Sequence, residues 1–445
     1  MFKKIIALML VCILSALSLT VFTACSDDDG DNSGFNTDPN ALAAFGCVYG
    51  VASDVKESSE KTDIKIGCIL IGDSTEGYTE AHIIGIQAAC EALGIDHTKE
   101  ENVIWKYKVL ESEDCTNTAR DLVAQGCNII ISNSYGHQDF MKSVAAEFPN
   151  VQFVAMTGDT AASSGLDNFS NAFTEVYQSR YVSGVVAGLK IKELLDNDKI
   201  PANGKDADGN VKVGYVGAYP YAEVVSGYTA FFLGIQSVVP NVVMDVQYTF
   251  EWYHLDKENE AAKLLMDRGC VIIGQHADSV GAPTAVQAAH NDGKEVYSIG
   301  YNIDMTNIGD AVLTSATNTW SVCYEYLFKS VINGADIATN WTGGYAQGAV
   351  ATTKLGTSVP EGTEAKINET VDAIKSGKLH VFDITKFTVD GKQVTSAFAT
   401  DSDGDWTADC NNVIADGYYH ESWVQSAPSF TLRIDGITEL NPNQN

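Results

Sequence analysis

Aromatic and polar side chains follow five apolar segments of this chain, each at the point where a β-strand is expected to end. The five runs cover residues 72–78, 133–136, 251–253, 276–279 and 301–304. Aromatic rings bind flat heterocycles by stacking. Ring N–H groups and sugar hydroxyls need hydrogen-bond partners once desolvated, and Asp and Asn supply them. The combination predicts a nucleobase or nucleoside site. The candidate ligand-binding residues are Asp73, Tyr78, His82, Asn133, Tyr135, Trp252, Asp278 and Asp304.

Each candidate also has a purely structural explanation. Tyr78 and Trp252 could fill a core, as aromatic residues commonly do. Asp278 and Asp304 could cap helices after their strands, which is a frequent role for Asp. His82, one helical turn after Tyr78, could be a half-buried helix residue. The sequence alone does not decide between the two roles.

Linear signatures of catalysis are missing from the chain. There is no P-loop, no GxSxG elbow, no HExxH and no GxGxxG after a strand, and the eight histidines show no metal spacing. This favours a binding protein without a cofactor over an enzyme such as a nucleoside hydrolase. The run from Asp401 to Asp409 alternates carboxylates as Ca²⁺ loops do, but its Gly is fourth rather than sixth, so a polar hairpin is the stronger interpretation.

The elements that must position these residues alternate between strand and helix from Asp63 onward. Strands are expected at 64–70, 104–110, 128–132, 151–156, 242–250, 271–275, 296–300 and 311–315, and helices at 78–93, 116–124, 138–147, 176–195, 324–332 and 364–376. Repeated βαβ units predict an α/β fold of parallel sheets with helices on both faces, doubly wound.

The chain also repeats itself. Residues 64–67, 77–79, 85–87 and 122–130 recur in the same order at 211–214, 227–229, 234–236 and 265–273. Four matches in register predict two related α/β lobes. The lobes are expected to cover 63–174 plus about 303–334, and 175–302 plus about 335–445 with a β-rich extension. Open α/β sheets bind ligands at the carboxyl ends of their strands, and paired lobes close about a hinge.

The N-terminus has the pattern of an export signal. Lys3 and Lys4 precede an apolar run from Ile5 to Phe22, and small residues then lead to Cys25. We expect a lipoprotein signal peptide over 1–24, a lipid on Cys25, and an acidic tether over 25–62. A plain N-terminal membrane helix is the competing interpretation.

Charge and cysteine content restrict the partners. There are 28 Lys and Arg against 58 Asp and Glu, a net charge of −30, which disfavours nucleic acid. The ten cysteines show no zinc spacing, and Cys68 and Cys270 have the pattern of small buried hydrophobic residues.

From about residue 64 to 320 the chain resembles the basic membrane protein family of ABC-transporter substrate-binding lipoproteins, which includes purine nucleoside receptors. The motifs lie at 77–82, 147–153, 183–188, 231–234, 275–279 and 299–305. The resemblance implies a type I periplasmic-binding-protein fold, a purine between Tyr78 and Trp252, and acidic partners at Asp278 and Asp304. We further expect a monomer, anchored outside the cytoplasmic membrane through Cys25, that serves a permease and its ATPase.

The first loop departs from the pattern of the nucleoside-binding members. Those members usually have Asp-Lys-Ser-Phe-Asn, whereas residues 75–79 read Thr-Glu-Gly-Tyr-Thr. Base and nucleoside therefore both remain open as ligands. The same residue types would also suit a sugar receptor, and the sequence leaves room for a surface adhesin or sensor without a transport role.

Overall fold

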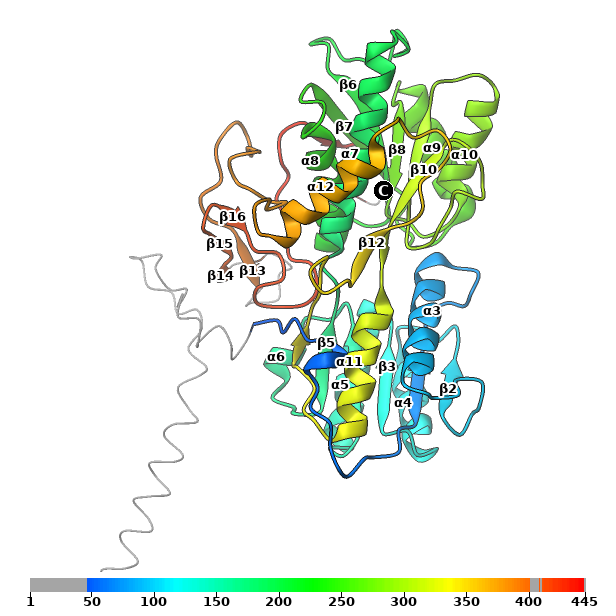
Figure 1. The fold of residues 1–445 in the computed structure, drawn as a ribbon, viewed down its shortest axis with the longest axis vertical. Coiled ribbons are helices and arrows are strands. Elements are labelled where there is room, and N and C mark those ends of the chain that lie inside the picture. The colour runs from blue at the N-terminus through cyan, green and yellow to red at the C-terminus, as the bar shows by residue number, and fades with distance from the viewer. Residues whose placement is uncertain (1–45, 401–407, 409, 444–445) are drawn as a thin grey trace, which may run out of the picture.

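The computed structural model describes residues 46–400, 408 and 410–443, which form two α/β lobes stacked end to end (Figure 1). The first lobe lies at the bottom of the view and the second at the top. Each lobe contains one large sheet covered by helices, so the expected α/β class with two doubly wound lobes is confirmed.

The first lobe contains a six-stranded sheet in which every pair is parallel. Its order is β11-β5-β4-β3-β1-β2. The strands are β1 (Ile66–Ile69), β2 (Val103–Lys106), β3 (Ile129–Ser132), β4 (Gln152–Met156), β5 (Phe169–Ala172) and β11 (Asn340–Trp341). The helices are α3 (Gly77–Ala92), α4 (Glu113–Ala124), α5 (Gln138–Glu147), α6 (Ala161–Ser164) and α11 (Trp320–Asn333), with short 3₁₀ turns η1 (Ala52–Asp54) and η2 (Tyr135–His137). Strands such as β3 are buried throughout, as a sheet with both faces covered requires.

The second lobe contains a seven-stranded sheet in the order β12-β10-β9-β8-β6-β7-β17. Its strands are β6 (Val211–Gly217), β7 (Val242–Tyr248), β8 (Ile272–Gln275), β9 (Tyr297–Tyr301), β10 (Val312–Asn318), β12 (Val350–Thr352) and β17 (Ile437–Glu439), and only β12 runs antiparallel to its neighbour. Its helices are α7 (Val176–Asp196), α8 (Ala222–Gln236), α9 (Leu255–Asp267), α10 (Gly281–Asn291) and α12 (Thr363–Lys375). Two small hairpins follow: β13 (Phe398–Thr400) with β14 (Cys410–Asn412), and β15 (Ile414–Ala415) with β16 (Tyr418–Tyr419).

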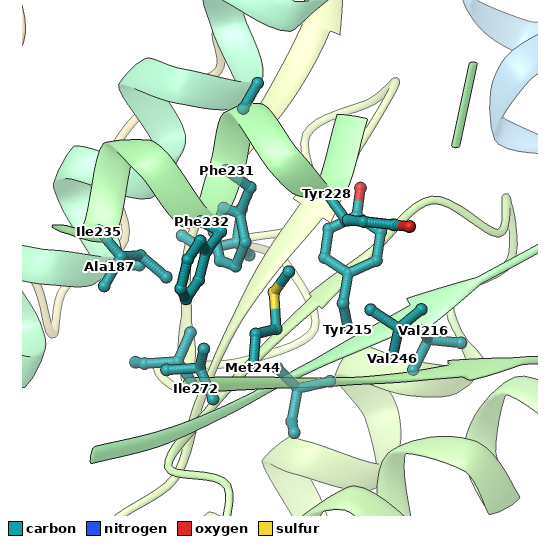
Figure 2. Close-up of a cluster of buried hydrophobic side chains, with 14 of the residues drawn as sticks. Ala187, Tyr215, Val216, Tyr228, Phe231, Phe232, Ile235, Met244, Val246 and Ile272 are labelled. Atoms are coloured by element: carbon teal, nitrogen blue, oxygen red, sulfur yellow. The ribbon is translucent and has the colours of Figure 1, made fainter. Parts of the chain in front are cut away.

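The core of the second lobe lies on both faces of the sheet, one part under α7 and α8 and the other under α9 and α10. Phe231 and Phe232 of α8 lie above Met244 of β7 and Ile272 of β8 (Figure 2). The two helices approach closely because glycines meet at the contact: a Cβ on Gly184 would come within 2.1 Å of the Phe231 carbonyl oxygen. A larger residue there would force the helices apart.

The internal repeat is also visible in the structure. Gly126 follows α4 at φ 88° and Gly269 follows α9 at φ 98°. This left-handed conformation suits glycine, and it ends each helix before the next strand begins. Matching residues therefore perform the same backbone task in both lobes.

The predicted lobe boundary needs one correction. Strand β10 pairs with β9 and so belongs to the second sheet, although the first lobe was expected to include residues 303–334. The chain crosses to the first lobe only after Asn318, where α11 packs on α3, and returns between Trp341 and Val350. A strand pattern does not specify which of two sheets the strand will join.

The predicted tether needs a second correction. Within the described part of it, Val48 bridges to Trp341, whose Nε1 donates to the Gly50 carbonyl at 2.7 Å, and Val55 is buried. Residues 48–55 therefore pack on the first lobe, through backbone hydrogen bonds at Val48 and Gly50 and through the buried side chain of Val55. The predicted signal peptide, Cys25 and the start of the tether lie outside the described residues.

The C-terminal region extends the core of the second lobe. Phe430 stacks on Phe382 with ring centroids 4.3 Å apart, and β17 pairs with β7 at the edge of the sheet. The Asp401–Asp409 run, the candidate calcium loop, falls outside the described residues except for position 408.

Candidate functional site

A cavity of about 370 Å³ lies between the lobes, at the carboxyl ends of both sheets. Six of the eight predicted site residues line it: Asp73, Tyr78, Asn133, Tyr135, Trp252 and Asp278. The lobes touch beside it, since a Cβ on Gly77 would lie 3.1 Å from the Asp278 carbonyl oxygen. A more open groove of about 440 Å³ lies elsewhere, beside Tyr248 and Asn441.

Tyr78 contributes an aromatic ring to the first-lobe wall. It is the second residue of α3, and the Glu76 carboxylate caps this helix by accepting from the Tyr78 N–H at 2.7 Å and the Thr79 N–H at 2.9 Å. The Tyr78 ring meets the His82 ring edge-on, with centroids 4.5 Å apart. Both contacts hold the tyrosine ring in place at the cavity.

His82 does not line the cavity. It is fully buried, its Nδ1 lies 2.6 Å from the Tyr324 hydroxyl, and its ring stacks on Trp320 at 4.2 Å. Burial lowers its pKa to about 3, so the imidazole is neutral. The residue therefore supports Tyr78 from behind the wall, close to the structural role that the sequence left open.

Trp252 contributes a second ring from the opposite lobe. It follows β7 after a turn in which Phe250 has φ 55°, and its carbonyl oxygen accepts from the Asp278 N–H at 2.8 Å. Its half-buried ring packs against the Tyr219 ring, with the centroids 5.2 Å apart. The centroid of the His276 ring lies 6.4 Å from that of Trp252. Two strand-end loops are thereby joined at the place where this ring enters the cavity.

Asp278 is the most deeply buried acid of the cavity, with 7% of its surface exposed. Its Oδ1 accepts from Asn302 Nδ2 at 2.6 Å. Burial raises the pKa of this carboxyl well above its usual range, and the nearby carboxylates of Glu76, Glu258 and Glu223 raise it further. Such a group gains strongly from a hydrogen-bond donor that enters the cavity.

The other first-lobe candidates line the cavity but already have protein partners. Asp73 pairs with Lys108 at 2.7 Å, and this hydrogen bond lowers the pKa of the carboxyl. Asn133 accepts from the Ile71 N–H at 2.8 Å and donates to Thr79, while the Tyr135 hydroxyl donates to Asp159 at 2.8 Å. These side chains line the cavity and also stabilise its wall through bonds to neighbouring protein groups.

Asp304 does not line the cavity. Its Oδ2 lies 3.0 Å from Lys354 Nζ, and its Oδ1 accepts from the Thr306 N–H at 2.9 Å. The carboxylate thus closes the loop after β9 and forms an ion pair. Its place in the family pattern did not predict this outward position.

Several lining residues were not among the predicted site residues, and three of them lie together on the second lobe. Glu223 lies at the start of α8, and His276 and Tyr301 lie at the ends of β8 and β9. The repeat carried a signal for Glu223: β6 matches β1, so the loop after β6 must border the cleft as the loop after β1 does. His276 and Tyr301 stand at the head of runs that were identified, but their own roles were not.

These three residues form one polar group with Arg180 behind it. His276 Nε2 lies 3.2 Å from Glu223 Oε1, and the Arg180 guanidinium lies 3.4 Å from the centroid of the Tyr301 ring. Burial and the nearby Arg180 lower the pKa of His276 to about 4. The neutral imidazole therefore donates from Nε2 to Glu223.

Comparison with known proteins assigns the chain to a family. A family model described as ABC transporter substrate-binding protein PnrA-like matches residues 71–384. The chain belongs to this family. It is 32% identical over 341 residues to a purine-binding protein of Brucella abortus, a match that spans 76% of this chain and 87% of the relative. Over 261 residues it is 30% identical to a Haloferax volcanii protein named as a putative ABC transporter glucose-binding protein, spanning 58% of this chain and 60% of the relative.

Solved structures of this family's fold superpose on most of the chain. A solute-binding protein of an ABC transporter system from Aeropyrum pernix gives a TM-score of 0.59 at 15% identity, covering 72% of this chain and 93% of its own. One from Conexibacter woesei gives 0.55 at 21% identity, covering 71% and 98%. The predicted type I periplasmic-binding-protein fold is confirmed, and this PnrA-like protein is a substrate-binding protein of an ABC transporter, as predicted.

Two further features of the described residues bear on the predictions. Within 46–400, 408 and 410–443, no helix combines the length and apolar character needed to cross a membrane, and no three metal-ligating side chains gather. Cys68 and Cys270 are buried free thiols, which confirms the prediction for both.

Proposed function

We propose that this PnrA-like protein captures a purine nucleobase or nucleoside in the cavity between its lobes and delivers it to an ABC permease. The observation that carries the proposal is the pair of rings, Tyr78 and Trp252, that line one cavity from opposite lobes beside the buried Asp278 carboxyl. Stacking on two rings suits a flat base, and the carboxyl suits a ring N–H or a ribose hydroxyl. The purine-binding relative from Brucella abortus supports the same ligand class.

A sugar is the second candidate, because one relative is named for glucose binding. Sugar sites stack rings too, but they surround the ligand with hydrogen-bonding groups on all sides. In this cavity Asp73, Asn133 and Tyr135 are already bonded to protein groups. This favours the purine.

The remaining proposals concern export and assembly. We propose that residues 1–24 are removed, that Cys25 carries a lipid, and that the body works as a monomer outside the cytoplasmic membrane with a permease and its ATPase. Mass spectrometry of membrane-extracted protein tests the anchor, since a diacylglyceryl group on Cys25 is expected. We also propose that no bond is broken in the ligand, so prolonged incubation with inosine should release no hypoxanthine.

A thermal-shift assay against adenine, adenosine, ribose and glucose tests the ligand class. A purine should raise the melting temperature, because a ligand that binds only the folded state stabilises it. Native mass spectrometry of protein purified without added ligand should then detect a co-purified purine. Stabilisation by ribose or glucose with no response to adenine or adenosine would refute the proposal.

A further inference from the structure

Two carboxylates on the second-lobe wall each keep one oxygen unused by the protein. Glu223 engages His276 through Oε1, and Asp278 engages Asn302 through Oδ1. Across the described residues, no hydrogen bond reaches the second oxygen of either side chain. Both residues line the cavity. The wall therefore presents two carboxyl oxygens with which a ligand can form hydrogen bonds.

The cavity lining contains more acidic than basic side chains. Four carboxylates line it, those of Asp73, Glu76, Glu223 and Asp278, against one described cation, Lys108. Lys108 is paired with Asp73 at 2.7 Å. Three carboxyl groups thus lack a cation within the lining, so a negative charge on a ligand would lie beside acidic groups in a partly enclosed space.

Arg180 lies behind the lining and presents no hydrogen-bond donor to the ligand. Its guanidinium is buried against the Tyr301 ring at 3.4 Å, and Nη1 donates to the Gln275 carbonyl oxygen. It lies behind Tyr301 and is not part of the lining. Among the described residues, an anionic group in the cavity would find no free cation there to bind.

We propose that the cavity selects purines with a donor-rich edge, namely amino-substituted purines and their nucleosides, and that it rejects anionic purines and nucleotides. Glu223 is the specificity-determining residue, since its free oxygen accepts from the exocyclic amino group. Adenine and guanine offer such donors. Xanthine carries carbonyl oxygens where the other purines carry an amino group, urate is an anion at neutral pH, and a 5′-phosphate adds negative charge beside the acidic lining. This inference rests on the proposed purine-binding function and specifies its ligand.

Isothermal titration calorimetry with adenine, guanine, xanthine, urate, adenosine and AMP tests the proposal on purified protein freed of ligand. The better of adenine and guanine should bind at least about tenfold more tightly than xanthine or urate. AMP should bind at least about a hundredfold more weakly than the better of adenine and adenosine.

Glu223→Gln should reduce the preference over urate to about threefold or less, because it removes the charge but keeps the size. Glu260→Gln, on the exposed face of α9, is the matched control and should leave the preference unchanged. Circular dichroism checks that both variants fold, and Asp278→Asn repeats the test on the neighbouring acid.

The outcomes separate this inference from the proposed function. If xanthine, urate or AMP binds as tightly as adenine, the selection is wrong while purine binding stands. An unchanged preference in Glu223→Gln and Asp278→Asn also overturns it. If no purine binds and a sugar does, both proposals fail.

Discussion

Asp73 and Asp278 lie on opposite walls of one cavity, and their surroundings shift the pKa values of the two carboxyl groups in opposite directions. Asp73 on the first lobe is bonded to Lys108, which lowers the pKa of its carboxyl. Asp278 on the second lobe is buried near other acids, which raises the pKa of its carboxyl. One group is satisfied before any ligand arrives, whereas the other still needs a donor.

The same contrast extends to the neighbouring residues of each wall. On the first lobe, Asn133 and Tyr135 are bonded to protein partners, and Glu76 caps α3. On the second lobe, Glu223 keeps an unused oxygen next to His276. The difference indicates that the first lobe contributes the Tyr78 ring and polar groups already bonded to the protein. The second lobe contributes the groups that recognise the edge of the ligand.

The largest expected effect comes from removing the buried acid. Asp278→Ala should weaken purine binding by about 2 to 4 kcal/mol, roughly 30- to 1,000-fold in Kd, because a fully desolvated hydrogen bond to the ligand is lost and its partner is left unpaired. Asp304→Ala is the matched control at the next strand end, where the carboxylate faces Lys354. Calorimetry should find less than about a threefold change for the control. Equal losses in both variants would contradict the contrast between the walls.

The two rings should have the next largest effect. Trp252→Ala and Tyr78→Ala should each cost about 1 to 3 kcal/mol of binding free energy, because each removes one stacking face. Trp105→Ala serves as the control, since that ring stacks on Tyr107 outside the cavity. Fluorescence titration with adenine measures all three. If Trp105→Ala weakened binding as much as Trp252→Ala, the rings would act through stability instead.

The sequence predicted which strand ends line the cavity better than it predicted which side chains there are free to bind a ligand. Periodicity and the repeat predicted the strand ends, so they predicted where Tyr78, Asn133 and Trp252 would meet. They did not predict partners: Asp278 and Asp304 have the same sequence setting, yet only one carboxylate faces the cavity. That outcome depends on Lys354, which is distant in sequence and lies 3.0 Å from Asp304.

Two further differences have the same physical origin. His82 lies on the same helix face as Tyr78, but Trp320 and Tyr324 of α11 cover it. The sequence around His82 could not predict this contact, because α11 is distant in the chain. Glu223 was missed because its strand end carries few polar residues, although the repeat implied its position.

The pH dependence of stability should also distinguish the walls. Glu258, which supports the Asp278 turn by accepting from the Ser279 N–H at 3.1 Å, is buried, and burial raises the pKa of its carboxyl to about 7. Between about pH 4.5 and 7 the folded state keeps a proton that the unfolded state releases, so stability falls as the pH rises. Glu258→Gln should remove this loss, gaining up to about 3 kcal/mol relative to wild type by pH 8.

Asp73 should behave in the opposite sense. Because Lys108 lowers the pKa of its carboxyl, the stability it contributes is present above about pH 4 and is lost as the pH falls further. Urea unfolding of wild type, Glu258→Gln and Asp73→Asn from pH 3 to 8 measures both slopes. If the two variants differed from wild type with the same pH slope, the assignment of opposite environments would be wrong.

The smallest effect on ligand binding is expected from replacing Asp73, the acid on the first-lobe wall. Asp73→Asn should change the Kd of a purine by less than about threefold, because its carboxylate is already paired with Lys108 in an exposed ion pair. Calorimetry with adenine and adenosine measures it, with Lys108→Met as the partner variant. A loss comparable to that of Asp278→Ala would give both walls the same role.

A crystal structure of the protein with adenine or adenosine tests the central claim most directly. We predict that the base lies between the Tyr78 and Trp252 rings, with its N–H groups within hydrogen-bond distance of Asp278 and Glu223. Density for the base outside the cavity, or a base that contacts neither ring, would contradict the account.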